Sequence, residues 1–404
     1  MLSLTGRRDG EPLGAPLALV EGVRAWAGEL ARLTAELGAP VVLDPLALLA
    51  QRAAVARLVR SGEVSCGGGS RLLACADGWV GVSLARPADW ESVAAWLGRP
   101  RPVAEGDWAA VAAGVAAVAG DELRAGAVLL GLPVAVLGER RRRGDPGGPP
   151  PLPGAIHGVD ARRIGSGAAA GSCAELTVVD LSSLWAGPLA ARLLARAGAR
   201  VVKVESTTRP DGARRGSPRF FHLLNAGKDS VALDFDTADG RRHLTEIVSR
   251  ADVVVTGARP RALRQLGLDL GTMVERGRPR IWLSVTGYGT AGGSGHRVAF
   301  GDDAAVAGGL VAFDDVGPCF CGDAIADPLC GLASAVAVLT ALGVDGSWVV
   351  DASMADIAGG LTGPAFAVAG LRPTPPPDPG DEPGAVTPAF GADTEAVLAG
   401  LATG

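Results

Sequence analysis

The sequence predicts an α/β fold, with a Rossmann-like parallel sheet domain and a smaller, mainly helical α+β domain. Residues 178–205 read as strand, turn, amphipathic helix and second strand, which is the repeating unit of a parallel sheet. Residues 1–139 instead carry Ala, Leu and Val at helical spacing, together with one pair of strand-like runs. At 404 residues the chain is long enough for a large domain and an accessory one.

Local signals mark each part of the unit at 178–205. Asp180 and the serines that follow it come after the first apolar run and can cap a helix. Gly187 and the proline after it leave space for a ligand near the start of that helix. Gly198 ends the helix, and the second strand ends in Lys203 and Glu205. By itself this unit indicates a parallel sheet and no particular chemistry.

Changes in composition divide the chain into four segments. These are a smaller domain at 1–139, a Pro/Gly/Arg-rich linker at 140–173, a Rossmann-like domain at 174–357 and a Pro-rich tail at 358–404. Within the smaller domain, Asp77 and Gly78 lie between two apolar runs and predict a β-hairpin. We expect the tail to end in a short strand and a helix that begins at Asp393 or Thr394 and returns to the large domain.

Composition and charge exclude several classes of protein. Charged residues make up 20% of the chain and the net charge is −5, so no basic surface favours nucleic acid as a partner. No apolar run reaches the length of a membrane span, and the N-terminal residues lack the apolar core of a signal peptide. We therefore expect a cytoplasmic protein without a membrane partner.

The six cysteines lack the spacing of a disulfide framework, which indicates reduced thiols. Cys319, Cys321 and Cys330 have neither a histidine nor a fourth cysteine close by in the sequence. A zinc site normally needs four such ligands. We expect no metal and no permanently bound cofactor.

Six segments downstream of residue 205 match the motifs of one known family, in the same order and at the same separations. They are 223–235 (LLNAGKDSVALDF), 251–269, 278–292 (RPRIWLSVTGYGTAG), 300–313 (FGDDAAVAGGLVAF), 327–342 and 349–356 (VVDASMAD). Together they resemble the family III CoA-transferases (CaiB/BaiF-like), which include formyl-CoA transferase, the carnitine CoA-transferases and the α-methylacyl-CoA racemases. The order of six motifs carries this resemblance, since each motif alone is weak.

The resemblance implies an acyl-CoA:carboxylate CoA-transferase that acts through an aspartyl-CoA thioester. Its substrates would be coenzyme A or acyl-CoA and a carboxylic acid acceptor, and residues 174–357 would bind CoA. The family fold also implies a homodimer of two interlocked chains. A pseudo-dimeric monomer stays open as an alternative because the order of segments in this chain departs from that of the family.

Segments typical of the family's later, smaller domain come first in this chain. Residues 5–16, 66–79 and 127–139 resemble that domain, whereas its expected copy after residue 356 is nearly absent. This order indicates a circular permutation or the remnant of a fused duplication. Either rearrangement is tolerable when the chain ends lie at the surface.

Asp302 is the first candidate for the nucleophile, and Asp303 is the alternative. The resemblance places a catalytic aspartate after the Gly-Tyr-Gly segment, at the start of a helix. Asp302 follows Phe300 and Gly301 and precedes an apolar helical run, as in the family pattern. A helix N-terminus also favours the ionised carboxylate. The competing interpretation is that Asp302 caps the helix and Asp303 fills its first turn.

Lys203, Lys228 and Arg259 are the candidate cations for the phosphates of CoA. The resemblance places the two lysines on the CoA-binding face, although each also suits a solvated surface charge. Arg259 with its following proline matches the family's Arg-Pro pair. The residues before it, 256–258, replace the family's Glu-Asn-Phe with Thr-Gly-Ala, so we expect altered or weak adenine binding.

Two glycine segments complete the candidate site. Gly287, Tyr288 and Gly289 form a turn that lets backbone approach a ligand, and Tyr288 either packs on the pantetheine arm or fills the core. Gly67 and the two glycines after it resemble a mobile loop that covers the nucleophile. The same run also suits a close approach within a hairpin.

Two other functions remain open within the family. A racemase needs a base on each face of the substrate, usually a histidine with the aspartate, but residues 244–295 contain no histidine and His296 is poorly placed. A catalytically impaired CoA-binding homologue would fit the departures from the family pattern. A Rossmann dehydrogenase fits poorly, because no G-x-G-x-x-G follows the strand at 178.

Overall fold

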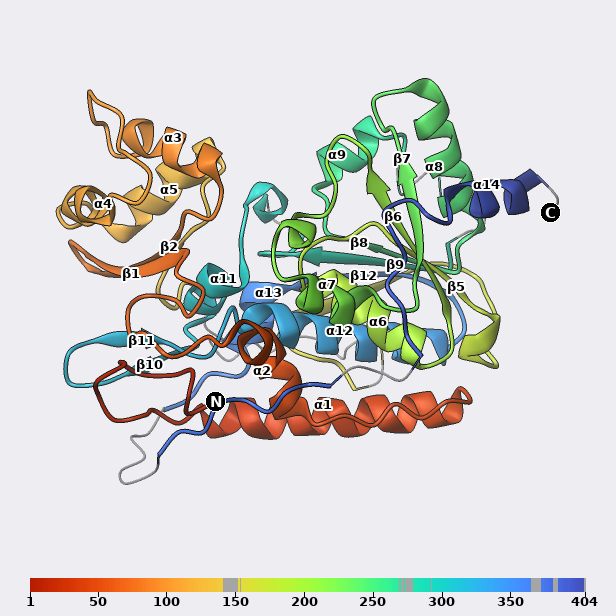
Figure 1. The fold of residues 1–404 in the computed structure, drawn as a ribbon, viewed down its shortest axis with the longest axis horizontal. Coiled ribbons are helices and arrows are strands. Elements are labelled where there is room, and N and C mark those ends of the chain that lie inside the picture. Colours follow the sequence, from red (N-terminus) through yellow and green to blue (C-terminus); the bar gives the residue numbers. More distant parts are fainter. Residues whose placement is uncertain are drawn as a thin grey trace.

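A seven-stranded sheet is the centre of the molecule (Figure 1). The computed structural model describes residues 1–140, 152, 154–268, 270, 273, 279–291, 293–364, 372–380 and 384–402. In spatial order the strands are β4 (Val159–Gly165), β12 (Ser347–Ser353), β9 (Ile281–Thr286), β8 (Val253–Thr256), β5 (Thr177–Asp180), β6 (Arg200–Ser206) and β7 (Asp229–Leu233). All neighbours pair in parallel except β4, which runs antiparallel to β12. This is the predicted α/β fold with a parallel sheet.

The sheet is covered on both faces, which explains why its strands are continuous apolar runs. Successive residues point to opposite faces, so Val178 packs with one core cluster and Val179 with the other. The large-domain helices are α6 (Ala186–Arg196), α7 (Pro218–Asn225), α8 (Ala238–Arg250), α9 (Pro260–Gln265), α11 (Gly301–Gly308), α12 (Ala326–Leu342), α13 (Met354–Gly359) and α14 (Thr394–Ala402). Three short 3₁₀ turns are η1 (Cys173–Glu175), η2 (Gly212–Arg215) and η3 (Ser294–His296). The predicted strand, helix and strand of 178–205 are confirmed as β5, α6 and β6.

Helix α12 is buried around nearly its whole circumference. It packs against α1 (Leu17–Glu36), α6, α11 and α13 and against strands of the central sheet. A helix surrounded in this way is expected to be apolar on all faces, as the sequence of α12 is. Among the described helices none is long and apolar enough to cross a membrane.

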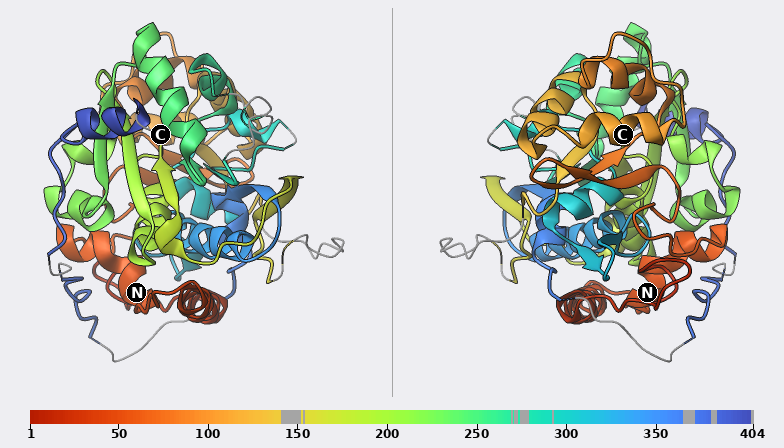
Figure 2. Two further views of the ribbon diagram at one scale, coloured as in Figure 1. Left: turned by 90° about the vertical axis from the view of Figure 1, so that its right-hand side faces the viewer. Right: turned by 90° about the vertical axis from the view of Figure 1, so that its left-hand side faces the viewer.

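A separate small unit holds the predicted hairpin. Strands β1 (Ser70–Cys75), β2 (Gly78–Ser83) and β3 (Val134–Val136) form a three-stranded antiparallel sheet. Cys75 pairs with Gly78 across the turn, which confirms the hairpin at Asp77 and Gly78. Helices α3 (Pro87–Trp96), α4 (Trp108–Val115) and α5 (Gly120–Leu130) share a core with this sheet. Figure 1 shows the unit at the left end of the molecule, and the right-hand view of Figure 2 looks onto that end.

The N-terminal helices belong to the large domain by packing, which differs from the predicted domain at 1–139. Helix α1 runs beneath α12 in Figure 1, and Leu19, Val23 and Leu30 are buried in the main core. Helix α2 (Pro45–Ala56) contacts α7 and α12. The cause is the apolar stripe of α1, which is buried against α12.

Two other segment predictions need correction. The interval 140–173 is not wholly a linker, because β4 within it forms the antiparallel edge of the main sheet; its charged part, 141–151, lies outside the described residues. In the tail, α14 begins at Thr394 as predicted, but residues 384–393 form no strand. Instead Asp393 accepts a hydrogen bond from Ser230 N at 2.8 Å, which fastens the tail beside β7. A short hairpin of β10 (Val311–Phe313) and β11 (Pro318–Phe320) completes the fold.

The contact between α11 and α13 leaves no room for a side chain at Gly308. A β-carbon there would lie 2.6 Å from both Ala355 O and Gly359 N. We therefore expect Gly308→Ala to lower the free energy of unfolding by about 1–3 kcal/mol. Gly28→Ala in α1 is the matched control, since its β-carbon would meet nothing within 4 Å. That change should add about 0.5–1 kcal/mol through helix propensity. Urea unfolding measures both changes. Equal changes in the free energy of unfolding would contradict the close packing at Gly308.

Candidate active site

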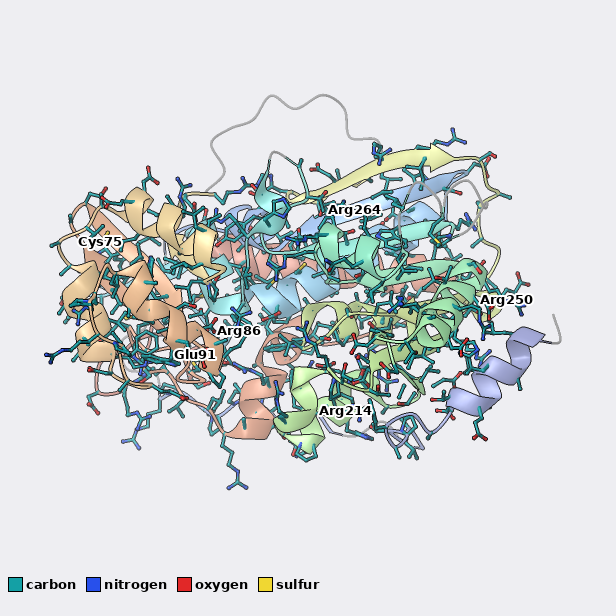
Figure 3. All side chains as sticks on the ribbon, turned by 90° about the horizontal axis from the view of Figure 1, so that it is seen from above. Cys75, Arg86, Glu91, Arg214, Arg250 and Arg264 are labelled. Carbon is teal, nitrogen blue, oxygen red and sulfur yellow. The ribbon has the colours of Figure 1, made fainter. Side chains whose placement is uncertain are left out.

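The two candidate aspartates start helix α11, where the small unit meets the large domain. All eight residues of Gly301–Gly308 are buried, between β2 and β3 on one side and α12 and α13 on the other. Phe300 is the extended N-cap residue, and Gly309 ends the helix with a φ of 82°. Arg86 of the small unit, labelled in Figure 3, lies with its guanidinium carbon 5.6 Å from the centre of the Phe300 ring. The small unit therefore fixes the start of this helix.

Asp302 is held by two hydrogen bonds and keeps a small exposed surface. Its Oδ1 accepts from Ala324 N at 3.0 Å, and its Oδ2 accepts from Ser70 Oγ at 3.0 Å. The residue is 9% exposed. Burial, followed by the nearby Asp323 carboxylate, raises the pKa of Asp302 above its ordinary value. This geometry suits a carboxylate that is oriented and partly desolvated.

Asp303 is wholly buried, and its hydrogen bonds hold the start of α11 in place. Its Oδ1 accepts from Ser83 Oγ at 2.8 Å and from Phe300 N at 2.9 Å, the second bond closing the helix N-terminus. Its Oδ2 has no hydrogen-bond partner among the described residues. Burial raises the pKa of Asp303 to about 7. Asp303 is thus partly protonated at neutral pH, which makes it the weaker nucleophile of the two.

Two more aspartates and one arginine surround Asp302. Arg52 on α2 binds Asp323 with two guanidinium nitrogens, the Nε to Oδ2 distance being 2.8 Å. Burial raises the pKa of Asp327 to about 7. Arg52 also lies over the Trp185 ring at 5.5 Å. Sequence reasoning did not identify Arg52, Asp323 or Ser70 as site residues, since no local motif marks them and they meet only through tertiary packing.

The glycine run at 67–69 leads directly into this site. Gly67 and Gly68 are exposed, and Gly68 has a φ of 80°, which favours glycine. The next residue, Ser70, donates its hydroxyl to Asp302. The run therefore lies beside the carboxylate that it was expected to cover, and its role as a moving loop stays a prediction.

Lys203 lies inside strand β6, which ends at Ser206, one residue beyond the predicted end at Glu205. Its Nζ is 2.9 Å from Asp211 Oδ2 and donates to Ser182 O at 3.0 Å. Burial lowers the pKa of Lys203, but the neighbouring carboxylates, Asp180 foremost, outweigh burial and raise it overall. The ammonium group is therefore charged and already paired.

Lys228 is likewise enclosed. Its Nζ donates to Asp180 Oδ2 at 2.9 Å, to Pro188 O at 2.9 Å and to Asn225 Oδ1 at 3.0 Å. Burial lowers the pKa of Lys228 to about 8, although Asp180 opposes that shift. All three donor positions of the ammonium group have partners. Both lysines thus hold the turns at the carboxyl ends of β5 and β6, and contact with CoA phosphates stays a prediction for them.

The remaining predicted residues are Arg259 and the turn at 287–289. Arg259 is exposed at the N-cap of α9. Close packing excludes a side chain at Gly287, because a β-carbon there would lie 2.6 Å from Ala299 Cβ. Tyr288 is 1% exposed and stacks under the Arg297 guanidinium at 3.4 Å, so its ring fills the core. Gly289 has a φ of 78°, which places the turn where glycine is favoured.

The described residues contain no group of three or more His, Cys, Asp or Glu side chains arranged to hold a metal ion. All six cysteines are free thiols. Burial raises the pKa of the Cys330 thiol to about 12 and that of Cys321 to about 11. These thiols are therefore unreactive packing residues at neutral pH.

A family model described as CoA-transferase family III matches residues 174–392, slightly more than half of the chain. The chain belongs to CoA-transferase family III. It is 29% identical over 178 residues to the succinyl-CoA–D-citramalate CoA-transferase of Chloroflexus aurantiacus, covering 42% of this chain and 44% of that protein. It is 30% identical over 185 residues to the succinate–glutarate CoA-transferase of Agrobacterium fabrum, covering 41% and 46%. The chain thus spans less than half the length of these relatives.

Among solved structures, this family III chain is similar to a CAIB/BAIF family protein from Brucella suis. The match is 30% identical, covers 46% of this chain and 54% of that one, and has a TM-score of 0.42. The family model begins at residue 174, so it does not include Arg52, Ser70 or Ser83. Three side chains around the two aspartates therefore come from outside the matched segment.

We expect Lys228→Met to lower the free energy of unfolding by about 3–5 kcal/mol, because the buried Asp180 loses the cation that is bonded to it directly. The double variant Lys228→Met/Asp180→Asn should recover part of that loss, since no uncompensated charge remains. Urea unfolding with linear extrapolation measures both. Unchanged stability in the single variant would show that the ammonium group is not enclosed.

The raised pKa of Asp303 predicts a pH-dependent contribution to stability. Its folded pKa of about 7 exceeds the ordinary value of 3.8, so the folded chain keeps a proton that the unfolded chain has lost. The resulting stabilisation is complete below about pH 4 and is lost as the pH rises through about 7. The free energy of unfolding of the wild type, relative to that of Asp303→Asn, should therefore decrease as the pH rises from about 4 to about 7. Unfolding midpoints across this range test it, and a constant difference would contradict it.

Proposed function

We propose that the protein is an acyl-CoA:carboxylate CoA-transferase with Asp302 as its nucleophile. Membership of CoA-transferase family III supports the reaction class. The observation that supports Asp302 as the nucleophile is the orientation of its carboxylate. Ser70 Oγ and Ala324 N hold it at the junction of the small unit and α11. Donors on both oxygens hold the group in one orientation, which favours attack on a bound thioester.

The proposed reaction passes through covalent intermediates on Asp302. The carboxylate attacks the thioester carbonyl of acyl-CoA and the carbon–sulfur bond breaks. CoA departs as the thiolate, and Asp302 and the acyl group form a mixed anhydride. The thiolate then attacks the Asp302 carbonyl, which releases the donor acid and forms an aspartyl-CoA thioester. The acceptor carboxylate repeats these two steps in reverse, so the new acyl-CoA leaves and the Asp302 carboxylate is restored.

Asp302 is preferred to Asp303 because the two carboxylates have different surroundings. Asp302 keeps exposed surface, whereas Asp303 has none and accepts the bond that closes the helix start. Burial, followed by Asp323, raises the pKa of Asp302 overall, and the charge of Arg52 opposes that rise. A carboxylate near a cation is more readily ionised, and only the ionised form attacks a thioester.

We propose that the glycine run at 67–69 opens to admit the thioester. Two cavities, one beside Arg57 and one beside Arg214, are not lined by Asp302. A movement of the loop that ends at Ser70 would expose the carboxylate and afterwards exclude water. Exclusion matters because each acyl intermediate is prone to hydrolysis.

We further propose that Arg259 and the turn Gly287, Tyr288 and Gly289 form part of the CoA-binding face, with Lys203 and Lys228 supporting its strand ends. The permuted order of segments and an interlocked homodimer belong to the same proposal. Segments 5–16 and 66–79 converge at Gly322, with Gly322 N donating to Thr5 Oγ1 at 3.1 Å and Cys66 Sγ to Gly322 O at 3.3 Å.

A catalytically impaired CoA-binding homologue is the second candidate. The observation that favours it is the near-complete burial of Asp302. A racemase is less favoured, because no histidine is among the hydrogen-bond partners described for Asp302 and His296 is exposed on η3. Deuterium exchange at the α-carbon of a branched acyl-CoA would detect racemase chemistry.

We expect Asp302→Asn to reduce CoA transfer by at least about 10³-fold, since the amide cannot attack a thioester. Intact-protein mass after incubation with a panel of acyl-CoAs, followed by hydroxylamine trapping and peptide mapping, should place the adduct on Asp302. The matched variant Asp303→Asn should retain the adduct. Labelling at Asp303 instead would move the nucleophile by one residue, and CoA binding without any adduct would favour the impaired homologue.

A further inference from the structure

Two serine hydroxyls connect the carboxyl groups of Asp302 and Asp303. The contacts, in order, are Asp302 Oδ2 to Ser70 Oγ at 3.0 Å, Ser70 Oγ to Ser83 Oγ at 2.9 Å and Ser83 Oγ to Asp303 Oδ1 at 2.8 Å. Ser70 and Ser83 are paired residues of β1 and β2, so the hairpin fixes the spacing of the two hydroxyls. We call these four residues the aspartate–serine network.

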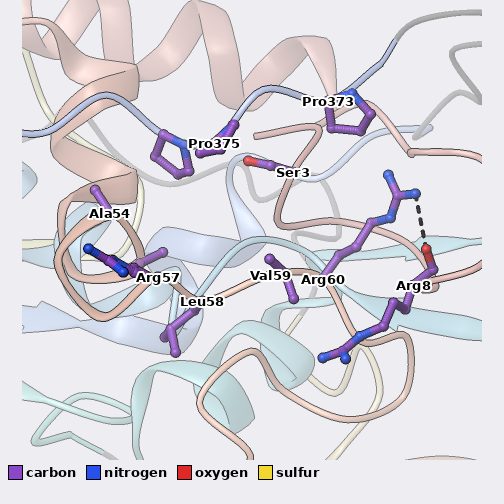
Figure 4. Close-up of a pocket in the computed structure, with 11 residues that line it drawn as sticks. Ser3, Arg8, Ala54, Arg57, Leu58, Val59, Arg60, Pro373 and Pro375 are labelled. Carbon is purple, nitrogen blue, oxygen red and sulfur yellow. Dashed lines mark hydrogen bonds between the residues drawn. The ribbon is translucent and has the colours of Figure 1, made fainter.

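The network is almost completely buried. Ser83 and Asp303 are 0% exposed, Ser70 is 4% exposed and Asp302 is 9% exposed. Neither the cavity shown in Figure 4 nor the cavity beside Arg214 is lined by any residue of the network. The hydrogen bonds that these side chains need must therefore come mainly from within the network and from adjacent backbone.

The hydrogens of the network are too few when both carboxyl groups are ionised. Three oxygen–oxygen contacts need three hydrogens, but each serine supplies only one. Ser70 then donates to Asp302. Ser83 donates to Asp303, and the contact between the two hydroxyl oxygens holds no hydrogen. Buried oxygens 2.9 Å apart without a hydrogen between them are unfavourable, and one further proton completes the set.

Asp303 is the residue whose surroundings favour that proton. Its Oδ2 has no hydrogen-bond partner among the described residues. An unpaired buried oxygen costs less free energy on a neutral acid than on a charged carboxylate. Burial raises the pKa of Asp303 to about 7, which agrees with this placement.

A proton on Asp303 gives every contact in the network one hydrogen. The protonated Oδ1 can donate to Ser83 and still accept from Phe300 N, which lies 2.9 Å away. Ser83 is then free to donate to Ser70. Ser70 donates to Asp302 in turn, so each hydroxyl accepts one bond and donates one. The hydrogen bonds then all point toward the ionised Asp302.

The charged groups around the network agree with this direction. Asp323 and Asp327, before and within the first turn of α12, act on the carboxylate of the proposed nucleophile, as does Arg52 of α2. Arg52 is bonded to Asp323 and offsets its charge. At the other end of the network, burial followed by Asp303 raises the pKa of Tyr288, so its hydroxyl is neutral. The cation of α2 thus favours the ionised form of the nucleophile and leaves the proton to Asp303.

We propose that the two aspartates share one proton through the two serines, and that Ser83 and Asp303 are positioning residues for the reaction of Asp302. The positioning role rests on the proposed function, whereas the shared proton does not. Successive hydrogen bonds that point the same way strengthen one another, so the network makes Ser70 a stronger donor to Asp302. When the thiolate attacks the Asp302 carbonyl, charge develops on an oxygen that already faces Ser70 or Ala324 N.

The first test detects protonated carboxyl groups by infrared spectroscopy and needs no catalytic activity. At one pH unit below the Asp303 pKa of about 7, the wild type should show a carboxylic acid C=O band that Asp303→Asn removes. Ser83→Ala should shift this band, because the acid loses the oxygen to which it donates. Ser70→Ala should shift the band as well, since Ser70 is joined to Asp303 through Ser83.

Ser347→Ala is the matched control for the serine variants. Its buried hydroxyl donates to Ser166 O at 3.2 Å, at the start of β12, and its loss should leave the band unchanged. If Asp303→Asn removes no band, the shared proton is refuted. A band that Ser70→Ala does not move would refute the network as its carrier. Unfolding midpoints show whether each variant is folded, and Ser70→Ala provides the comparison if Ser83→Ala is not.

The second test measures positioning by the pH dependence of CoA transfer. The wild-type kcat should fall as the pH rises through about 7, where the network loses its proton. Asp303→Asn should retain transfer without this decline. At about pH 6, Ser83→Ala should lower kcat about tenfold with an unchanged KM for acyl-CoA, because substrate binding does not use this hydroxyl. Ser347→Ala should keep the wild-type profile.

The outcomes separate this inference from the proposed function. A decline in kcat that persists in Asp303→Asn, or an unchanged kcat in Ser83→Ala, would overturn the positioning role. Transfer through Asp302 without an infrared band from Asp303 would refute this inference alone. The expected infrared shifts without any CoA transfer would refute only the proposed function and would leave the shared proton in place.

Discussion

The burial of two adjacent carboxylates at the start of α11 is the constraint on which the rest of the site depends. A buried carboxylate without hydrogen-bond donors costs several kcal/mol, so the chain must bring donors to it. Ser70 and Ser83, which pair across the open end of one hairpin, supply hydroxyls to Asp302 and Asp303, and their Oγ atoms lie 2.9 Å apart. Docking of the small unit therefore also orients the proposed nucleophile.

The same requirement explains the N-terminal region. The segment that matches CoA-transferase family III begins at residue 174, yet Arg52 and Ser70 lie before it and complete the surroundings of Asp302. Helix α1 packs along α12, and this buried apolar contact brings α2, and with it Arg52, to the large domain. The matched segment alone would therefore leave Asp302 without its hydroxyl donor and without the nearby cation.

The buried lysines show how polar residues can maintain a site without entering its chemistry. Lys203 and Lys228 share Asp180 as the main source of opposing charge. Lys203 donates to Ser182 O in the turn that leads into α6, and Lys228 donates to Pro188 O in the first turn of that helix. These interactions fix the carboxyl ends of β5 and β6, which is where parallel sheets place their ligands. Of the three predicted cations, only Arg259 is exposed.

The sequence by itself determined the parallel sheet, the β5–α6–β6 unit, the Asp77–Gly78 hairpin and the position of two aspartates at a helix start, because each depends on short-range periodicity, turns and caps. It did not determine that α1 and α2 join the large domain, that β4 is a strand of the main sheet, or that Lys203 and Lys228 are enclosed. Tertiary structure decided these, as it decided the approach of Arg52, Ser70 and Asp323 to Asp302. Such features depend on which surfaces meet, and residues far apart in the chain carry no local pattern that specifies their contact.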